Sequence, residues 1–150
     1  MRAVVQRVSH ASVEIEGKVV SKIPSGILVF IGIEDADTIA DSVWLAKKIS
    51  SIRIFSDKNG LMNKSINEIK GEILVVSQFT LYAKVKKGKR PSYIRAASPS
   101  YALPMYERFI KDLSLIIDKN VHSGEFGAMM KVDLINDGPV TIIIDTKNKE

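Results

Sequence analysis

The strongest constraint on the fold is an uninterrupted apolar run, Gly-Ile-Leu-Val-Phe-Ile-Gly-Ile, at residues 26–33. The run is far shorter than the about 18 residues that a membrane-spanning helix needs. Its β-branched residues favour a strand, and the lack of polar alternation indicates that both faces of that strand are buried. We therefore expect a strand here, at the centre of a sheet.

Shorter strand patterns and two helical patterns surround this run. Strands are predicted where apolar and β-branched residues stand between turn residues; they cover residues 2–8, 11–15, 18–21, 27–33, 52–55, 72–76, 131–135 and 140–145. The two helices do not follow every strand in alternation, which is typical of a mixed or antiparallel sheet. The sequence therefore predicts an α+β fold, and its length fits a single domain over residues 1–150.

Both predicted helices have start signals. Thr38 can cap a helix that ends near Ser50, and Ser98 followed by Pro99 is typical of a second helix start. Pro104 should kink the second helix or mark its true beginning. Apolar spacing predicts the buried faces, which comprise Ile39, Val43, Trp44, Ala46 and Ile49 in the first helix and Leu103, Tyr106, Ile110, Leu113 and Ile117 in the second.

What the sequence lacks excludes several kinds of site. The chain has no cysteine, and its two histidines, His10 and His122, have no second ligand at metal-binding spacing. Neither a GxxxxGK[ST] loop nor a GxGxxG turn is present, and the absence of GxSxG disfavours a conventional serine triad. We therefore expect no metal and no cofactor. The charged N-terminus has no signal-peptide core, so we expect a cytoplasmic protein without a membrane partner.

The positive charge of the chain is concentrated in one segment. No acidic residue occurs between Glu72 and Glu107, whereas six basic residues do: Lys84, Lys86, Lys87, Lys89, Arg90 and Arg95. The whole chain has a net charge of +5, so this segment accounts for the excess. Such a segment is a candidate contact for nucleic-acid phosphates, with Tyr82 and Tyr93 as possible stacking surfaces. The alternative is a solvated loop that keeps the protein soluble.

Two polar segments need a further explanation. Ser77-Gln78-Phe79-Thr80-Leu81-Tyr82 places hydroxyl and amide groups at the end of a buried strand. Asn136-Asp137-Gly138-Pro139-Val140-Thr141 has the turn chemistry of a hairpin loop between two strands. Residues 146–150 after it are polar and are expected to fray.

Together these segments resemble the D-aminoacyl-tRNA deacylases, small cytosolic enzymes that hydrolyse the ester between a D-amino acid and tRNA. The strings SQFTLY and NDGPVT, in this order, are highly specific to that family. Lys84 and Met129 depart from it, since an acidic residue is more usual at both positions. Further matches cover residues 1–8, 53–55, 62–63, 87–92, 106–109 and 124–128.

The resemblance implies a homodimer of partly barrel-like subunits, with each active site at the subunit interface. The Gly138-Pro139 bond would be cis and would reach into the partner's pocket, where its carbonyls would hold the substrate's amino group and clash with an L side chain. Glycine, which has no side chain, would pass, so mischarged glycyl-tRNA would also be hydrolysed. The tRNA would bind through its 3′ end, with Lys86, Lys87, Lys89 and Arg90 as further substrate-binding residues.

The resemblance also implies roles at the SQFTLY strand end. Backbone N–H groups of Phe79 and Thr80 would bind the oxyanion, while Ser77 and Gln78 would shape the strand end. Phe126 and Met130 would line the adenosine pocket or serve ordinary packing.

Two mechanisms are compatible with these residues. Thr80 could be the nucleophile, but the sequence places no base beside it. We favour the other mechanism, in which the 2′-hydroxyl of the terminal adenosine activates water. A non-catalytic RNA-binding module and a small-molecule esterase remain alternatives to the deacylase.

Overall fold

The computed structural model describes residues 1–150. Its elements, in chain order, are β1 (Arg2–Ile15), β2 (Lys18–Ile23), β3 (Gly26–Gly32), α1 (Ile39–Ser51), β4 (Phe55–Ser56), β5 (Met62–Lys64), β6 (Glu72–Ser77), the short 3₁₀ helix η1 (Phe79–Tyr82), α2 (Pro99–Ile117), β7 (His122–Ser123) and β8 (Lys131–Asp145). Neither long helix has the length and apolar character that crossing a bilayer requires.

One mixed sheet organises the molecule. Its strand order is β2-β1-β3-β6-β7, and β8 also pairs with β1. The β3–β6 and β6–β7 pairs are parallel, while β1 is antiparallel to β2, β3 and β8. The apolar strand β3 therefore lies at the centre, and the predicted α+β class with a mixed sheet is confirmed.

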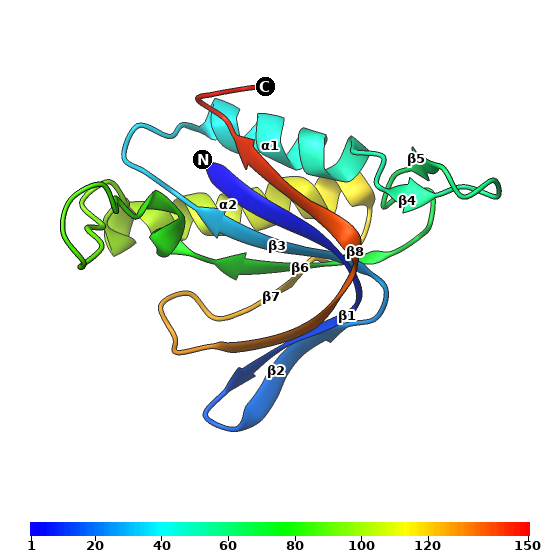
Figure 1. The fold of residues 1–150 in the computed structure, drawn as a ribbon, viewed down its shortest axis with the longest axis horizontal. Coiled ribbons are helices and arrows are strands. Elements are labelled where there is room, and N and C mark those ends of the chain that lie inside the picture. Colours follow the sequence, from blue (N-terminus) through cyan, green and yellow to red (C-terminus); the bar gives the residue numbers. More distant parts are fainter.

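The sheet curls toward a barrel, with both long helices on one side (Figure 1). The larger core cluster lies between the helices and the sheet, where Val5, Val29 and Val75 face Leu45 and Phe109. A smaller cluster, which includes Val13, Leu28 and Leu74, fills the concave side, which the far end of β1 and β2 cover. The two faces of β3 thus contribute to two cores, which explains its lack of polar alternation.

Both helices begin where the sequence predicts, but some residues predicted to lie on their buried faces are exposed. The Asp41 carboxylate accepts hydrogen bonds from the Thr38 N–H and hydroxyl, both at 2.8 Å, which fixes the start of α1. Helix α2 begins at Pro99 and continues through Pro104, so Pro104 does not mark its start. Ile39 and Leu103 are exposed, not buried as predicted. Leu103 directly follows the buried Ala102, and adjacent helical residues point about 100° apart.

The predicted hairpin at residues 136–139 is wrong, because β8 is one long strand that pairs with β1 on both sides of this segment. Gln6 pairs with Thr141 and Val8 pairs with Asn136, so residues 137–140 stand opposite Arg7 alone. These extra residues form a bulge in the strand, which we call the 137–140 bulge. Residues 2–15 are likewise one strand, not two.

Two smaller predictions also fail, and two short strands were not predicted. The predicted strand 52–55 is reduced to the two-residue β4, and β5 and β7 fall where no strand was predicted. Thr146 is buried, not frayed: its hydroxyl accepts a hydrogen bond from the Met1 amine, and its N–H donates to the Met1 carbonyl at 2.9 Å. These two bonds tie the two ends of the chain together, and the Met1 amine also forms a buried ion pair with Asp37.

Candidate active site at the end of strand β6

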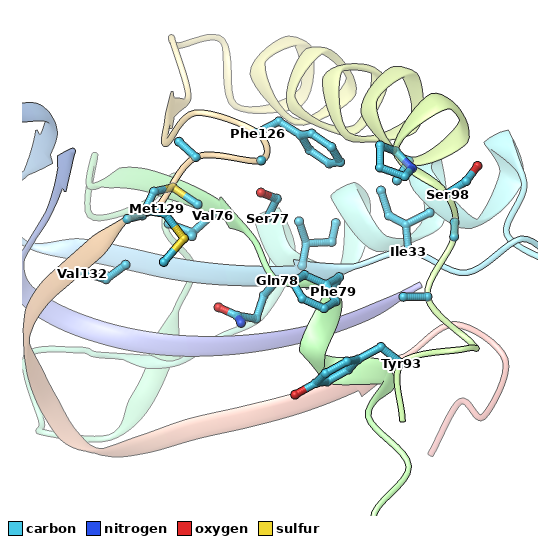
Figure 2. Close-up of a pocket in the computed structure, with 18 residues that line it drawn as sticks. Ile33, Val76, Ser77, Gln78, Phe79, Tyr93, Ser98, Phe126, Met129 and Val132 are labelled. Carbon is cyan, nitrogen blue, oxygen red and sulfur yellow. The ribbon is translucent and has the colours of Figure 1, made fainter. Parts of the chain in front are cut away.

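A pocket of about 670 Å³ lies where β3 and β6 end. Strand β6 contributes Val76 and Ser77, and the chain after it contributes Gln78 and Phe79. The start of α2 and a loop before β8 close the other sides (Figure 2). Since β3 and β6 are parallel, their carboxyl ends meet at this edge, where α/β sheets commonly bind ligands.

Five of the predicted site residues line this pocket: Ser77, Gln78, Phe79, Phe126 and Met130. Segments about 50 residues apart in the sequence therefore meet at one cavity. Thr80 is not in the lining, and its hydroxyl lies 2.5 Å from the Gln78 side-chain nitrogen, which donates to it. Gly138, Pro139 and the four basic residues 86, 87, 89 and 90 are not in the lining either.

Two main-chain N–H groups at the start of η1 have no hydrogen-bond partner in that helix. The Gln78 N–H donates to the Ile31 carbonyl at 2.7 Å, which ends the β3–β6 pairing. The chain then turns into η1, whose first bond runs from the Leu81 N–H to the Gln78 carbonyl at 3.2 Å. The N–H groups of Phe79 and Thr80 precede that bond and have no partner within the helix. These are the two donors that the family resemblance implies for an oxyanion.

The pocket lining holds almost no titratable group. Tyr93 is the sole titratable side chain among the residues that line it. Both histidines lie elsewhere, with a ring nitrogen of His10 3.0 Å from an Asp133 carboxylate oxygen and one of His122 3.0 Å from a Glu72 carboxylate oxygen. No three His, Cys, Asp or Glu side chains gather into a group able to hold a metal ion. Side-chain chemistry in this pocket is thus limited to hydroxyl, amide and apolar groups.

Phe126 is held in place by Tyr106, for which the sequence predicts only a place in the core. The ring centroids of Tyr106 and Phe126 are 5.7 Å apart, and the Tyr106 hydroxyl donates to the Val75 carbonyl at 2.9 Å. Burial raises the pKa of that hydroxyl well above its ordinary value. The bond joins α2 to β6 directly behind the pocket, so Tyr106 is a support for its apolar wall.

Tyr82 is the last residue of η1, and its side chain is buried. The guanidinium groups of Arg2 and Arg95 lie over its ring, with their central carbons 4.7 Å and 5.4 Å from the ring centroid. The hydroxyl is buried without a hydrogen-bond partner. Burial, with the nearby carboxylates of Asp37 and Glu34, raises the pKa of this hydroxyl far above its usual range.

We expect Tyr82→Phe to leave the free energy of unfolding unchanged or to raise it by about 1 kcal/mol, because a buried, unpaired hydroxyl costs about 1–3 kcal/mol. Tyr106→Phe is the matched control: it removes a hydroxyl that donates to Val75 and should lower stability by about 1 kcal/mol. Urea denaturation measures both. A Tyr82→Phe protein that is less stable than Tyr106→Phe would contradict the description of Tyr82.

The 137–140 bulge exposes residues 137–139, buries Val140 and is well anchored. The Arg7 guanidinium donates to the Asp137 carbonyl at 2.8 Å and to the Ile54 carbonyl at 2.6 Å. The Asn136 side chain donates to the carbonyls of Arg7 and Val140, both at 3.0 Å. The Gly138-Pro139 bond within the bulge is cis, as the resemblance implies. Gly138 and Pro139 lie on the surface, outside the pocket.

The basic segment forms an exposed loop beside the pocket. Lys84 pairs with Ser92 through main-chain hydrogen bonds of 2.8 Å and 3.0 Å, which close the loop at its base. Arg95 forms an ion pair with Glu34 at 2.8 Å. Four further cations of the basic segment, Lys86, Lys87, Lys89 and Arg90, are exposed and form no ion pair. Lys84 and Met129 are the two positions where the resembled family more usually has an acidic residue. Lys84 closes the base of the loop, and Met129 is exposed on the pocket rim.

This curled sheet with two helices on one side is also found in solved structures of other proteins. The structure of a probable eukaryotic D-amino acid tRNA deacylase matches with a TM-score of 0.81 at 20% identity, covering 95% of this chain and 97% of that one. The structure of a c-Myc DNA Unwinding Element Binding Protein matches with a TM-score of 0.90 at 40% identity, covering 97% and 98%.

The sequence comparisons identify the family. The family model described as D-Tyr-tRNA(Tyr) deacylase matches residues 4–145. The D-aminoacyl-tRNA deacylases of Bacteroides thetaiotaomicron and Bacteroides fragilis are 62% and 61% identical over 150 residues, which is all of this chain and all of each relative. The chain belongs to the D-Tyr-tRNA(Tyr) deacylase family. The resemblance seen in the sequence is confirmed, and with it the prediction of an enzyme.

Proposed function

We propose that this protein hydrolyses the ester bond between a D-amino acid and tRNA, releasing the free amino acid and tRNA in the cytoplasm. The observation that carries the proposal is the pocket at the end of β6, which combines the free N–H groups of Phe79 and Thr80 with a lining that has no carboxylate, imidazole or amine. Such a site can stabilise charge on an ester oxygen but supplies no side-chain base.

In the proposed reaction the substrate supplies the missing group. The 2′-hydroxyl of the terminal adenosine orients and activates a water molecule, whose oxygen attacks the ester carbonyl. The carbonyl oxygen becomes an oxyanion bound by the two N–H groups, and the carbon–oxygen bond to the ribose then breaks, with the proton passing to the departing ribose oxygen. Phe126 and Met130 bind the adenosine, while Ser77 and Gln78 hold the strand end in place.

The proposal includes a homodimer whose subunits complete each other's sites. Gly138 and Pro139 are exposed and lie outside the pocket of their own subunit, which is consistent with a role in the pocket of a partner. Their carbonyls hold the substrate's amino group and leave no space for an L side chain. Hydrogen fits in that space, so glycyl-tRNA is also a substrate.

We expect the exposed lysines and arginine of the basic segment to contact tRNA phosphates. Replacing Lys86, Lys87, Lys89 and Arg90 by alanine should raise KM and lower the slope of log KM against log salt by about 0.7–0.9 for each phosphate that is no longer bound. The control variant replaces four other exposed lysines, Lys18, Lys22, Lys58 and Lys111, and removes the same charge. An equal change of slope in both variants would show that the effect is general charge, not local binding of phosphates.

A deacylation assay with D-tyrosyl-tRNA and L-tyrosyl-tRNA tests the proposed function. We expect release of D-tyrosine and protection of the L ester. A non-catalytic RNA-binding module would release neither amino acid, and a small-molecule esterase that recognises no RNA would not depend on the tRNA. Either result would replace the deacylase proposal with the corresponding alternative.

A further inference from the structure

Two aromatic rings stand exposed on the rim of the pocket. Phe79 is 57% exposed and Tyr93 is 40% exposed, and both line the pocket. Their centroids are 5.1 Å apart at an interplanar angle of 73°, an edge-to-face arrangement (Figure 2). In a folded protein, large aromatic side chains that gather on a pocket rim and remain exposed are typical of a ligand-binding surface.

The position of the pair is fixed by the main chain. Phe79 opens η1, directly after the β3–β6 pairing ends. Tyr93 follows Ser92, which is hydrogen-bonded to Lys84, and the Tyr93 carbonyl accepts from the Ala96 N–H at 2.9 Å. Both rings are therefore attached to main chain that hydrogen bonds hold in place. Fixing the rings against a bound ligand consequently costs little conformational entropy.

The charge around Phe79 and Tyr93 indicates which kind of ligand this surface would bind. Tyr93 lies within the acid-free segment, between Arg90 and Arg95. An RNA strand that leaves the pocket along this segment meets cations for its phosphates and a ring for its bases. Aromatic rings combined with a cationic strip are the usual means of binding single-stranded nucleic acid.

We propose that Tyr93, packed against Phe79, is a stacking subsite for the unpaired nucleotide that precedes the terminal adenosine. This inference rests on the proposed function, because it places the adenosine in the pocket. The subsite recognises a base by its aromatic face, so it is indifferent to the amino acid and to the identity of the base. Its role is to hold the RNA end in register while the ester lies beside η1.

The test compares two short substrates that differ in the nucleotides before the adenosine. One is 3′-O-D-tyrosyl-adenosine, and the other is the trinucleotide CCA carrying D-tyrosine on its 3′ end. Stacking of one base should favour the trinucleotide in kcat/KM by about 5- to 150-fold. Tyr93→Ala should abolish that preference, and Tyr93→Phe should retain it. Ile94→Ala, which removes a neighbouring exposed apolar side chain, is the matched control and should also retain it.

Three outcomes would overturn the subsite. An unchanged preference in Tyr93→Ala would show that the ring contacts no nucleotide. An equal decrease on both substrates would assign the ring to the amino acid or to the local fold. A Tyr93→Ala protein whose dimer dissociates, as measured by sedimentation, would assign the ring to an interface between subunits.

A binding measurement separates this inference from the proposed function. The affinity of unesterified CCA should fall about tenfold in Tyr93→Ala, while that of adenosine should not change. If the wild-type protein hydrolyses neither ester, the proposed function fails, but the weaker binding of CCA still supports the subsite. Equal CCA affinity in the wild type and Tyr93→Ala overturns the subsite, whatever the activity.

Discussion

A D-tyrosyl-tRNA that ends in 2′-deoxyadenosine is expected to be hydrolysed about 10³-fold more slowly than the normal substrate, whereas Thr80→Ala should retain most of the wild-type rate. The reason is the composition of the pocket, whose lining contains no histidine, lysine, arginine or carboxylate. Thr80 lies outside that lining, and the partner of its hydroxyl is the Gln78 amide, which is not a base. Single-turnover rates with saturating enzyme measure the chemical step.

Two controls make this result specific. A tRNA with a deoxyribose at the preceding nucleotide should react normally, because only the terminal 2′-hydroxyl lies beside the ester. Thr80→Ser keeps a hydroxyl and should match the wild type. If Thr80→Ala were about 10³- to 10⁶-fold slower while the deoxy substrate reacted normally, Thr80 would be the nucleophile and the proposed mechanism would be wrong.

The parts of the fold that local sequence determines were predictable. The apolar run at residues 26–33 predicts a buried strand because no other short element hides both faces, and β3 occupies that position. Thr38 and Pro99 predict the helix starts because capping and proline geometry act within one turn. Each of these signals depends on neighbours in the chain alone.

The failures arise where distant segments decide the structure. Glycine, proline, asparagine and aspartate suit a hairpin turn and a strand bulge equally well, so the sequence of residues 136–139 could not distinguish them. The choice is made by β1, which pairs with β8 on both sides of Arg7. The two-residue β7 is too short to show any periodicity, and its pairing with β6 is long-range as well.

The residues of the candidate site also divide into those that the sequence predicts and those that only the folded chain brings together. Polar groups after a buried strand draw attention to Ser77 and Gln78, but the family resemblance assigned their roles and those of Phe79, Phe126 and Met130. The small residues that lead into α2, Ala96 and Ala97, line the pocket without any chemical signal in the sequence. The packing of the Tyr93 ring against Phe79 has no sequence signal either, since the two residues belong to different segments that only the folded chain brings together.

Replacing Gly138 by alanine is expected to lower D-tyrosyl-tRNA hydrolysis by about 10²-fold and to weaken discrimination against the L ester, because displacing a substrate-binding group by about 1 Å has an effect of this size. An added Cβ would lie 2.7 Å from the Asn136 side-chain oxygen and 3.0 Å from the Val140 nitrogen, so the Asn136 side chain, which anchors the 137–140 bulge, or the bulge itself must shift. Gly60→Asn is the matched control: a Cβ there meets nothing within 4 Å, and asparagine tolerates its positive φ of 80°. Gly60→Asn should keep wild-type activity and discrimination.

Mixing two inactive variants tests whether the bulge acts on the partner's pocket. Ala128→Trp, whose bulk occupies the pocket, removes the pocket but leaves the bulge intact, and Gly138→Ala does the reverse. In a mixed dimer the pocket of the Gly138→Ala subunit would receive the intact bulge of the other subunit. Random reassociation of equal amounts should therefore restore about a quarter of the wild-type activity, since about half of the dimers are mixed and each has one complete site. A bulge that serves its own subunit would leave every site in the mixture defective, so a mixture as inactive as its components would refute the exchange of bulges between subunits.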